Sequence, residues 1–159
     1  IDRAGSTQRA VRFVITHTTQ RKYGSDQIMA EVLKAIVLGL GRAVDAELLG
    51  ALGAQALATF TPASAAAAGL RQDELRAVVG TDGTGAAADR GALFVDGIPA
   101  ELTADAAGTM IAAWNRFAVA VEPEIRVVVE RNSRLEMIIT VFTDMQAMVP
   151  DPAFAWAAV

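Results

Sequence analysis

The chain has 159 residues, of which 53% are hydrophobic, and its formal net charge at pH 7 is -4. This length fits one compact unit or a small two-lobed one with a real core. The acidic balance argues against a surface that neutralises phosphates, because nucleic-acid-binding proteins cluster Lys and Arg on one face. We therefore expect no tight binding to DNA.

The apolar fraction, with a mean hydropathy of +0.35, is high for a small free-standing domain. Two interpretations stay open: part of the apolar surface meets partner chains, or the figure is raised by the alanine-rich stretch 51–69. The absence of cysteine excludes disulfide and thiolate chemistry and leaves the redox compartment undetermined, with cytosol as the default.

No segment predicts a membrane span. The longest uncharged apolar run, residues 35–41, is far shorter than the ~20 residues that a bilayer requires, so we expect no membrane partner. Residues 1–5 begin with Ile1 and lack a basic start followed by an apolar stretch. We expect no signal peptide, and we expect an upstream segment that this sequence does not include.

The first fifty residues predict a strand followed by a long helix. Residues 10–18 alternate between two faces, which places His17 on the same face of a strand as Val11. Residues 26–49 carry apolar side chains at steps of three and four, as an amphipathic helix does. Gly39 and Gly41 each cost such a helix about 1 kcal/mol against alanine, which suggests the close approach of another backbone.

The middle of the chain predicts shorter elements. Residues 50–69 favour a loop or short helical turns around Pro62, and residues 71–79 suit a short amphipathic helix closed by Gly80. Residues 81–91 then predict a flexible loop. Four short strands of one small sheet are expected at residues 92–95, 98–102, 110–113 and 117–121.

The last part of the chain predicts a long hairpin. Residues 125–129 and 135–141 alternate on either side of the turn-prone pair Asn132-Ser133. Two prolines, at 150 and 152, end the hairpin, and residues 153–159 then form a final apolar strand. A strand, a long helix, a mixed sheet and a hairpin together indicate an α+β fold.

Nothing in the sequence forms a convincing metal or nucleophile site. The only histidine, His17, cannot build a zinc site without further His or Cys ligands, and no Gly-x-Ser-x-Gly segment marks a nucleophile. Gly80 and Gly85 have the separation of the glycines in a phosphate-binding loop, but Ala86 and Ala87 stand where Lys and Ser or Thr are needed. We expect no catalytic residue, no cofactor and no metal.

Carboxylates are the remaining candidates for catalysis. Glu122 and Glu124, on either side of Pro123, are the closest pair, and we expect them to be solvated. An enzyme alternative, a hydrolase using Asp82 and Asp89, stays open for experiment. The sequence nevertheless favours a protein that is not an enzyme.

Three segments resemble the major capsid proteins of tailed bacteriophages, whose shell fold is similar to that of encapsulin compartments. Residues 25–49 resemble the family's spine helix, with an Arg-Ala-x-Asp-Ala pattern at residues 42–46. Residues 91–100, GALFVDGIPA, resemble a strand-turn segment, and residues 125–159 resemble the closing hairpin with its tail MVPDPAFAWAAV. The resemblance corresponds to the C-terminal two-thirds of such a protein, and little of the family's N-terminal arm and extended loop precedes residue 10.

The resemblance implies a peripheral domain, residues 1–50 and 121–149, and an axial domain, residues 51–120 and 150–159. It implies a structural protein that self-assembles through pentamers and hexamers into the icosahedral head of a tailed phage or prophage. Scaffolding and portal proteins would be further partners, and packaged DNA would be contacted only non-specifically. The location would be the virion capsid, and the bacterial host cytoplasm during assembly.

Two alternatives to the phage head stay open. One is an encapsulin-like compartment subunit, because the shell fold is shared. The other is a head-completion or adaptor subunit, or another protein-binding module, that uses the long helix and hairpin as a docking surface.

Overall fold

The computed structural model describes residues 6–159, and the expectations about residues 1–5 lie outside this range. The chain forms two compact units: a first unit of residues 1–44 and 120–146, and a second unit of residues 45–119 and 147–159. The predicted peripheral and axial domains have their boundaries at 50, 120 and 149. The roles of those two domains stay a prediction.

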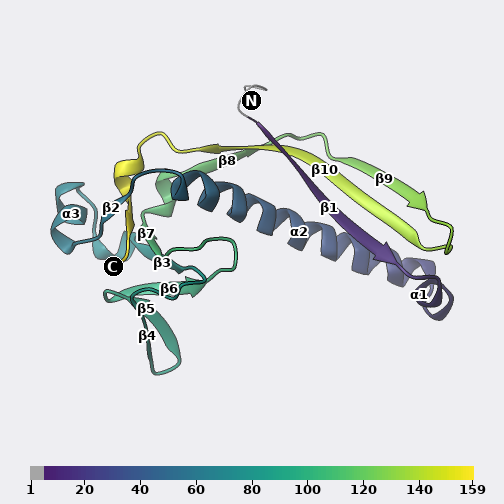
Figure 1. Cartoon of the computed structure of the whole chain (residues 1–159), viewed down its shortest axis with the longest axis horizontal. Helices are drawn as coiled ribbons and strands as arrows, with labels where there is room; N and C mark the ends of the chain where they lie inside the picture. The colour runs from purple at the N-terminus through teal and green to yellow at the C-terminus, as the bar shows by residue number, and fades with distance from the viewer. Residues whose placement is uncertain (1–5) are drawn as a thin grey trace. The chain divides into compact units, whose positions relative to one another are not determined.

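The first unit is built on an antiparallel sheet around one long strand, β10 (Met137–Met148). Strand β1 (Thr7–Ile15) pairs with one edge of β10, and β9 (Arg126–Arg131) pairs with the other edge (Figure 1). Strand β8 (Ala118–Val121) also joins this sheet, whereas the sequence placed it with the three strands before it. The predicted single sheet of four short strands is therefore wrong for β8.

The first strand ends earlier than predicted. Residues 16–18 do not extend it, because the Thr16 hydroxyl accepts a hydrogen bond from the Thr19 amide at 3.2 Å and caps helix α1 (His17–Lys22). His17 is therefore an exposed residue in the first turn of a helix, and its predicted place on the strand face beside Val11 is wrong. The alternating pattern correctly predicts the strand up to the end of β1. It does not show that the side chain of the next residue caps a helix, which ends the strand there.

The predicted long helix is confirmed. Helix α2 (Ser25–Gly53) has 29 residues and contains the whole predicted segment. Ile28, Val32 and Ile36 lie at the helical spacing of four and pack against the sheet residues Ile139 and Val141. This contact forms the core of the first unit.

Gly39 marks the close approach of a side chain, not of the predicted backbone. A Cβ atom at Gly39 would lie 2.9 Å from Cγ1 of Val11 in β1, whereas one at Gly41 would meet nothing within 4 Å. The missing side chain at Gly39 therefore lets α2 pack closely on β1.

Gly39→Ala is expected to destabilise the first unit by about 1 kcal/mol, because the crowding outweighs the gain in helix propensity. Gly41→Ala, the matched control, should stabilise it by up to about 1 kcal/mol. Urea unfolding followed by circular dichroism measures both. Equal stabilisation by the two variants would contradict the tight contact with Val11.

The predicted hairpin is also confirmed, with β9 antiparallel to β10 and Val127 opposite Val141. Asn132 organises its loop, because its side-chain oxygen accepts hydrogen bonds from the amides of Arg134 and Glu136, both at 3.0 Å. Strand β10 continues past the alternating residues 135–141 and ends at Met148, just before Pro150, where the sequence predicts the end of the hairpin.

The second unit contains a seven-stranded sheet in the order β2-β11-β7-β3-β6-β5-β4. Its core includes the buried side chains of Leu75, Val95 and Ile111. The strands are β2 (Ala58–Thr59), β3 (Arg76–Val79), β4 (Ala86–Asp89), β5 (Ala92–Val95), β6 (Ile98–Leu102), β7 (Met110–Ala112) and β11 (Ala155–Ala157). The strands predicted at β5, β6 and β7 are confirmed, and so is the α+β class. The final strand predicted at residues 153–159 is shorter than expected, because η3 includes residues 153 and 154 and β11 ends at Ala157.

Two predictions in this unit are wrong. The helix expected at 71–79 is a short 3-10 turn, η1 (Gln72–Glu74), followed by β3, whose Ala77 and Val79 are buried between β6 and β7. The loop expected at 81–91 contains β4, which forms a hairpin with β5. In both places the pairing partner, which a single segment cannot show, determines the structure.

The remaining connections agree with the sequence. Helix α3 (Pro62–Ala67) is one of the predicted short helical turns, and its cap Thr61 accepts a hydrogen bond from the Ser64 amide at 3.0 Å. Asp96 and Gly97 form the predicted turn between β5 and β6 with positive φ values of 50° and 77°. Two further short turns are η2 (Trp114–Arg116) and η3 (Pro152–Phe154).

Candidate assembly surfaces

An apolar strip on α2 is left uncovered in the first unit. Met29, Leu33 and Val37 follow one another at intervals of four residues, which places them on one face of the helix. Their exposed fractions are 57%, 56% and 69%. The helix therefore carries more apolar surface than the core of its own unit uses.

A second uncovered apolar surface lies on β9. Val127 and Val129 are opposite Val141 and Ile139 in the sheet, so all four project from the same sheet face. Val141 and Ile139 are covered, with 1% and 6% exposed, but Val127 and Val129 are 51% and 58% exposed. This face of the sheet is therefore buried on β10 and exposed to solvent on β9.

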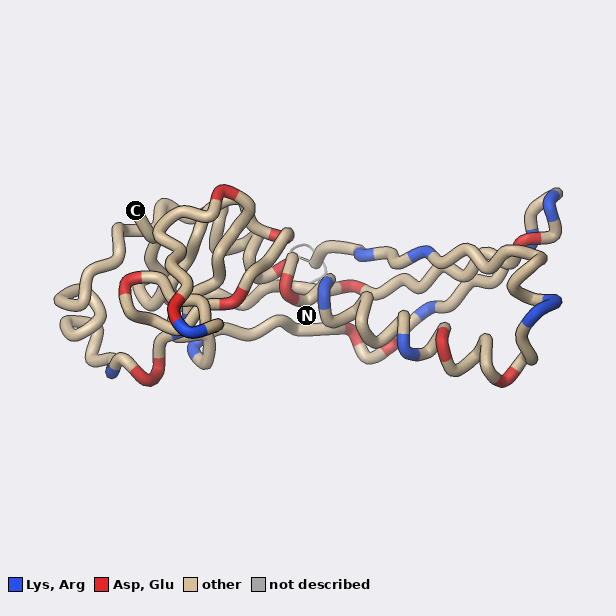
Figure 2. Tube along the Cα trace, turned by 90° about the horizontal axis from the view of Figure 1, so that it is seen from below, with Lys and Arg blue, Asp and Glu red and all other residues tan. Residues whose placement is uncertain are grey.

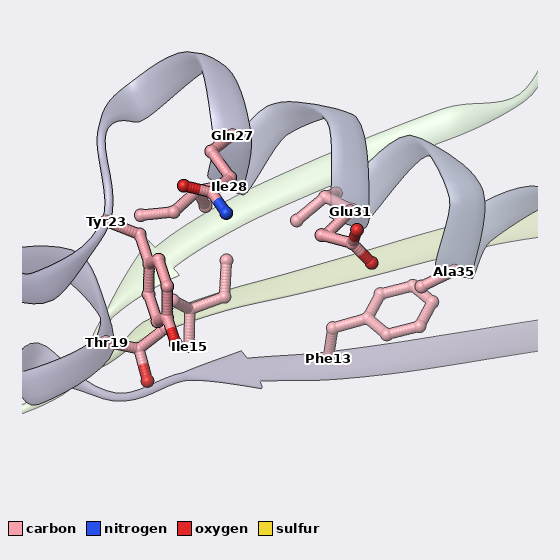
Figure 3. Close-up of a pocket in the computed structure, with 9 residues that line it drawn as sticks. Phe13, Ile15, Thr19, Tyr23, Gln27, Ile28, Glu31 and Ala35 are labelled. Atoms are coloured by element: carbon pink, nitrogen blue, oxygen red, sulfur yellow. The ribbon is translucent and has the colours of Figure 1, made fainter.

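The strip on α2 lies on the flank of the helix that is turned away from β1. Gln27, Glu31 and Ala35 line a cavity together with residues of β1, which shows that this side of α2 faces β1 (Figure 3). Met29, Leu33 and Val37 each follow one of these residues by two positions, about 200° round the helix. They therefore lie on the opposite flank, towards β9. We call Met29, Leu33, Val37, Val127 and Val129 the α2–β9 apolar surface.

The cavity between β1, α1 and α2 has a volume of about 410 Å³. Phe13, Ile15 and Ile28 supply apolar walls, and Tyr23 and Glu31 bring polar atoms to it (Figure 3). A pocket of this kind is suited to an apolar side chain or small apolar group. The sequence did not predict it, because its walls come from three separate elements.

The charged residues provide no comparable site. In Figure 2, Lys and Arg are interspersed with Asp and Glu along the described trace, without a long basic run. Within residues 6–159 no group of three or more His, Asp or Glu side chains could hold a metal ion. The same part of the chain contains no helix long and apolar enough to cross a membrane.

The carboxylates considered from the sequence have different surroundings. Asp82 accepts a hydrogen bond from the Thr84 amide at 3.0 Å and shapes a turn, while Asp89 is exposed on β4. Glu122 and Glu124 line one polar cavity of about 380 Å³ with Arg126. None of these residues forms a nucleophile and base pair within the described chain.

The chain has the same fold as a capsid protein and an encapsulin of known structure. A capsid protein of a native GTA particle matches with a TM-score of 0.57 and 12% identity, over 96% of this chain and 72% of that one. A protein of Mycobacterium phage Che8 matches with a TM-score of 0.57 and 8% identity, over 96% and 70%.

An encapsulin shows the same similarity. The SrpI encapsulin of Synechococcus elongatus PCC 7942 matches with a TM-score of 0.53 and 11% identity, over 96% of this chain and 73% of that one. No family model and no curated protein matches the sequence. The resemblance to the capsid fold is thus confirmed by structure at identities where sequence comparison finds nothing.

Proposed function

We propose that this protein is a structural subunit that assembles with copies of itself into a closed shell, the head of a tailed phage or prophage. The observation that carries the proposal is the fold, which this chain shares over 96% of its length with a capsid protein of a GTA particle and with an encapsulin. The proposal includes pentamers and hexamers as capsomers, a non-enzymatic role and a location in the virion capsid. During assembly the protein would be in the host cytoplasm, with scaffolding and portal proteins as partners.

The α2–β9 apolar surface supports this proposal on physical grounds. Five large apolar side chains that are each more than half exposed are costly to leave in water on a small unit. Burial against a neighbouring subunit would remove that cost, at about 25 cal/mol for each Å² of apolar surface. Assembly therefore explains an apolar surface that the fold of the single chain does not use.

An encapsulin-like compartment is the second candidate, because the encapsulin match is nearly as good as the phage matches. The two candidates differ in what the shell contains. Shells purified from the natural host would hold nucleic acid in the first case and protein cargo in the second. The ratio of absorbance at 260 and 280 nm separates them.

Replacing Leu33 and Val37 together by Gln is expected to reduce assembly without unfolding the chain. Both side chains are exposed, so the free energy of unfolding should change by less than about 0.5 kcal/mol for each. Loss of their burial in the shell should raise the concentration needed for assembly at least about tenfold. Light scattering against protein concentration measures this threshold.

The matched control for this double variant is Leu38→Gln. Leu38 is 60% exposed on α2 but lies roughly 100° or more away from each residue of the strip. It should leave the assembly threshold unchanged. If Leu38→Gln raises the threshold as much as the double variant does, the α2–β9 apolar surface has no special role.

A further inference from the structure

Strand β9 has an edge that no other strand of the described chain covers. It pairs with β10 along one edge only, over residues 126–131. The Asn132 amide donates to the Glu136 carbonyl at 3.1 Å, across the same hairpin. The backbone groups of successive residues in an antiparallel strand point alternately to the two edges of the strand. Val128 is four residues before Asn132, so its amide and carbonyl also point to β10. The amides and carbonyls of Val127 and Val129 point to the opposite, uncovered edge. Such an edge is a template for another strand.

The charges on β9 are arranged so that the strand complements itself. Arg126 and Glu130 lie two residues before and two residues after Val128, and both are exposed. If a second copy of β9 runs antiparallel with Val128 opposite Val128, each Arg126 meets the Glu130 of the other copy. In the same register Val127 meets Val129, and these are the residues whose backbone groups point outward.

Other registers lose this complementarity. A shift of two residues one way places Glu130 opposite Glu124, and a shift of two the other way places Arg126 opposite Asn132. Shifts of four place Arg126 opposite Arg126, or Glu130 opposite Glu130. Since opposite charges facing each other across a sheet stabilise it and like charges destabilise it, the register centred on Val128 is favoured.

We propose that two copies of the chain join through their β9 edges, antiparallel, around a twofold axis at Val128. The two sheets then form one continuous sheet, and the exposed Val127 and Val129 of each copy pack against each other across the axis. We assign a second copy of β9 to this edge because the charges of β9 are complementary to those of an antiparallel copy of the same strand. This inference rests on the proposed function, in which copies of the chain must meet, and it names one contact between them.

Cysteine substitution tests the register directly, because residues 1–159 contain no cysteine. Across the axis, the two Val128 Cα atoms form a pair without mutual hydrogen bonds, about 4.5 Å apart. This separation lies within the range of about 4.4–6.8 Å that disulfides span. The two Val129 Cα atoms are offset along the strands by two residues, roughly 7–8 Å or more apart, which is too far.

Val128→Cys in the full natural chain is therefore expected to give disulfide-linked dimers under mild oxidation, on a non-reducing gel. Val129→Cys, although more exposed, should cross-link at least about tenfold more slowly. Adding Glu130→Arg to Val128→Cys places Arg opposite Arg twice and should also slow cross-linking about tenfold. Thermal unfolding confirms that all three variants are folded.

Two results would overturn the proposal: no dimers from folded Val128→Cys, or equally fast cross-linking of Val129→Cys. If adding Glu130→Arg leaves the rate of cross-linking unchanged, the proposed charge pairing is wrong. Shell formation by the unaltered chain is measured separately by electron microscopy. Shells without Val128 cross-links would refute this contact and leave the proposed function intact, whereas cross-links without any higher assembly would refute the function alone.

Discussion

Gly80→Ala is expected to destabilise the second unit by about 3 kcal/mol, at the upper end of the cost of inserting an atom into a packed site. A Cβ atom on Gly80 would overlap the carbonyl oxygen of Gly108 and lie 2.5 Å from that of Ala107. These are backbone atoms, which cannot rotate away as a side chain can. The loop after β3 is held there by hydrogen bonds of 3.0 Å from the amides of Thr81 and Asp82.

The measurement for Gly80→Ala is urea unfolding followed by tryptophan fluorescence. Both tryptophans, Trp114 and Trp156, belong to the second unit, so the signal reports on that unit. Gly50→Ala is the matched control, because Gly50 is inside α2 with nothing within 4 Å of its Cβ position. That variant should gain up to about 1 kcal/mol. A loss below about 1 kcal/mol for Gly80→Ala would contradict the described packing.

Trp156→Ala is expected to cost about 4 kcal/mol of the free energy of unfolding of the second unit. Trp156 lies on β11 between β2 and β7, and only 3% of it is exposed. Its ring meets Phe60 edge-to-face, with the ring centroids 5.9 Å apart. The side chain therefore joins the C-terminal strand to the core, and its removal leaves a large cavity.

Trp114 remains as the fluorescent probe for this variant. Val159→Ala, three residues further along the chain at an 82% exposed position, is the control and should change stability by less than about 0.5 kcal/mol. In a double-mutant cycle with Phe60→Leu, the coupling between the two rings should be about 1 kcal/mol. Similar small losses for Trp156→Ala and Val159→Ala would show that β11 is not part of the core.

The sequence predicted the elements whose pattern is long. Helix α2 and the β9–β10 hairpin repeat their apolar spacing over many residues, so local pattern and final structure agree. Strands β3 and β4 were missed for different reasons. The charged run before Arg76 resembles a helix face, and the alanines of β4 have little strand preference, so both strands depend on their neighbours in the sheet.

The assembly surfaces could be predicted only in part. The apolar spacing of α2 assigns Val32 and Leu33 equally to the apolar side of the helix, yet Val32 is buried and Leu33 is exposed. The distinction depends on where the sheet ends, which only the three-dimensional structure shows. One signal was present in the sequence: the apolar positions of α2 occupy a wider arc than one packed face needs.

Copies of this chain are proposed to build a shell. Electron microscopy of the full natural chain, purified and concentrated over a range of salt concentrations, tests it most directly. We expect rings of five or six subunits, sheets or closed shells, alone or with a scaffolding protein. Particles that stay the size of a single chain under all these conditions would contradict it.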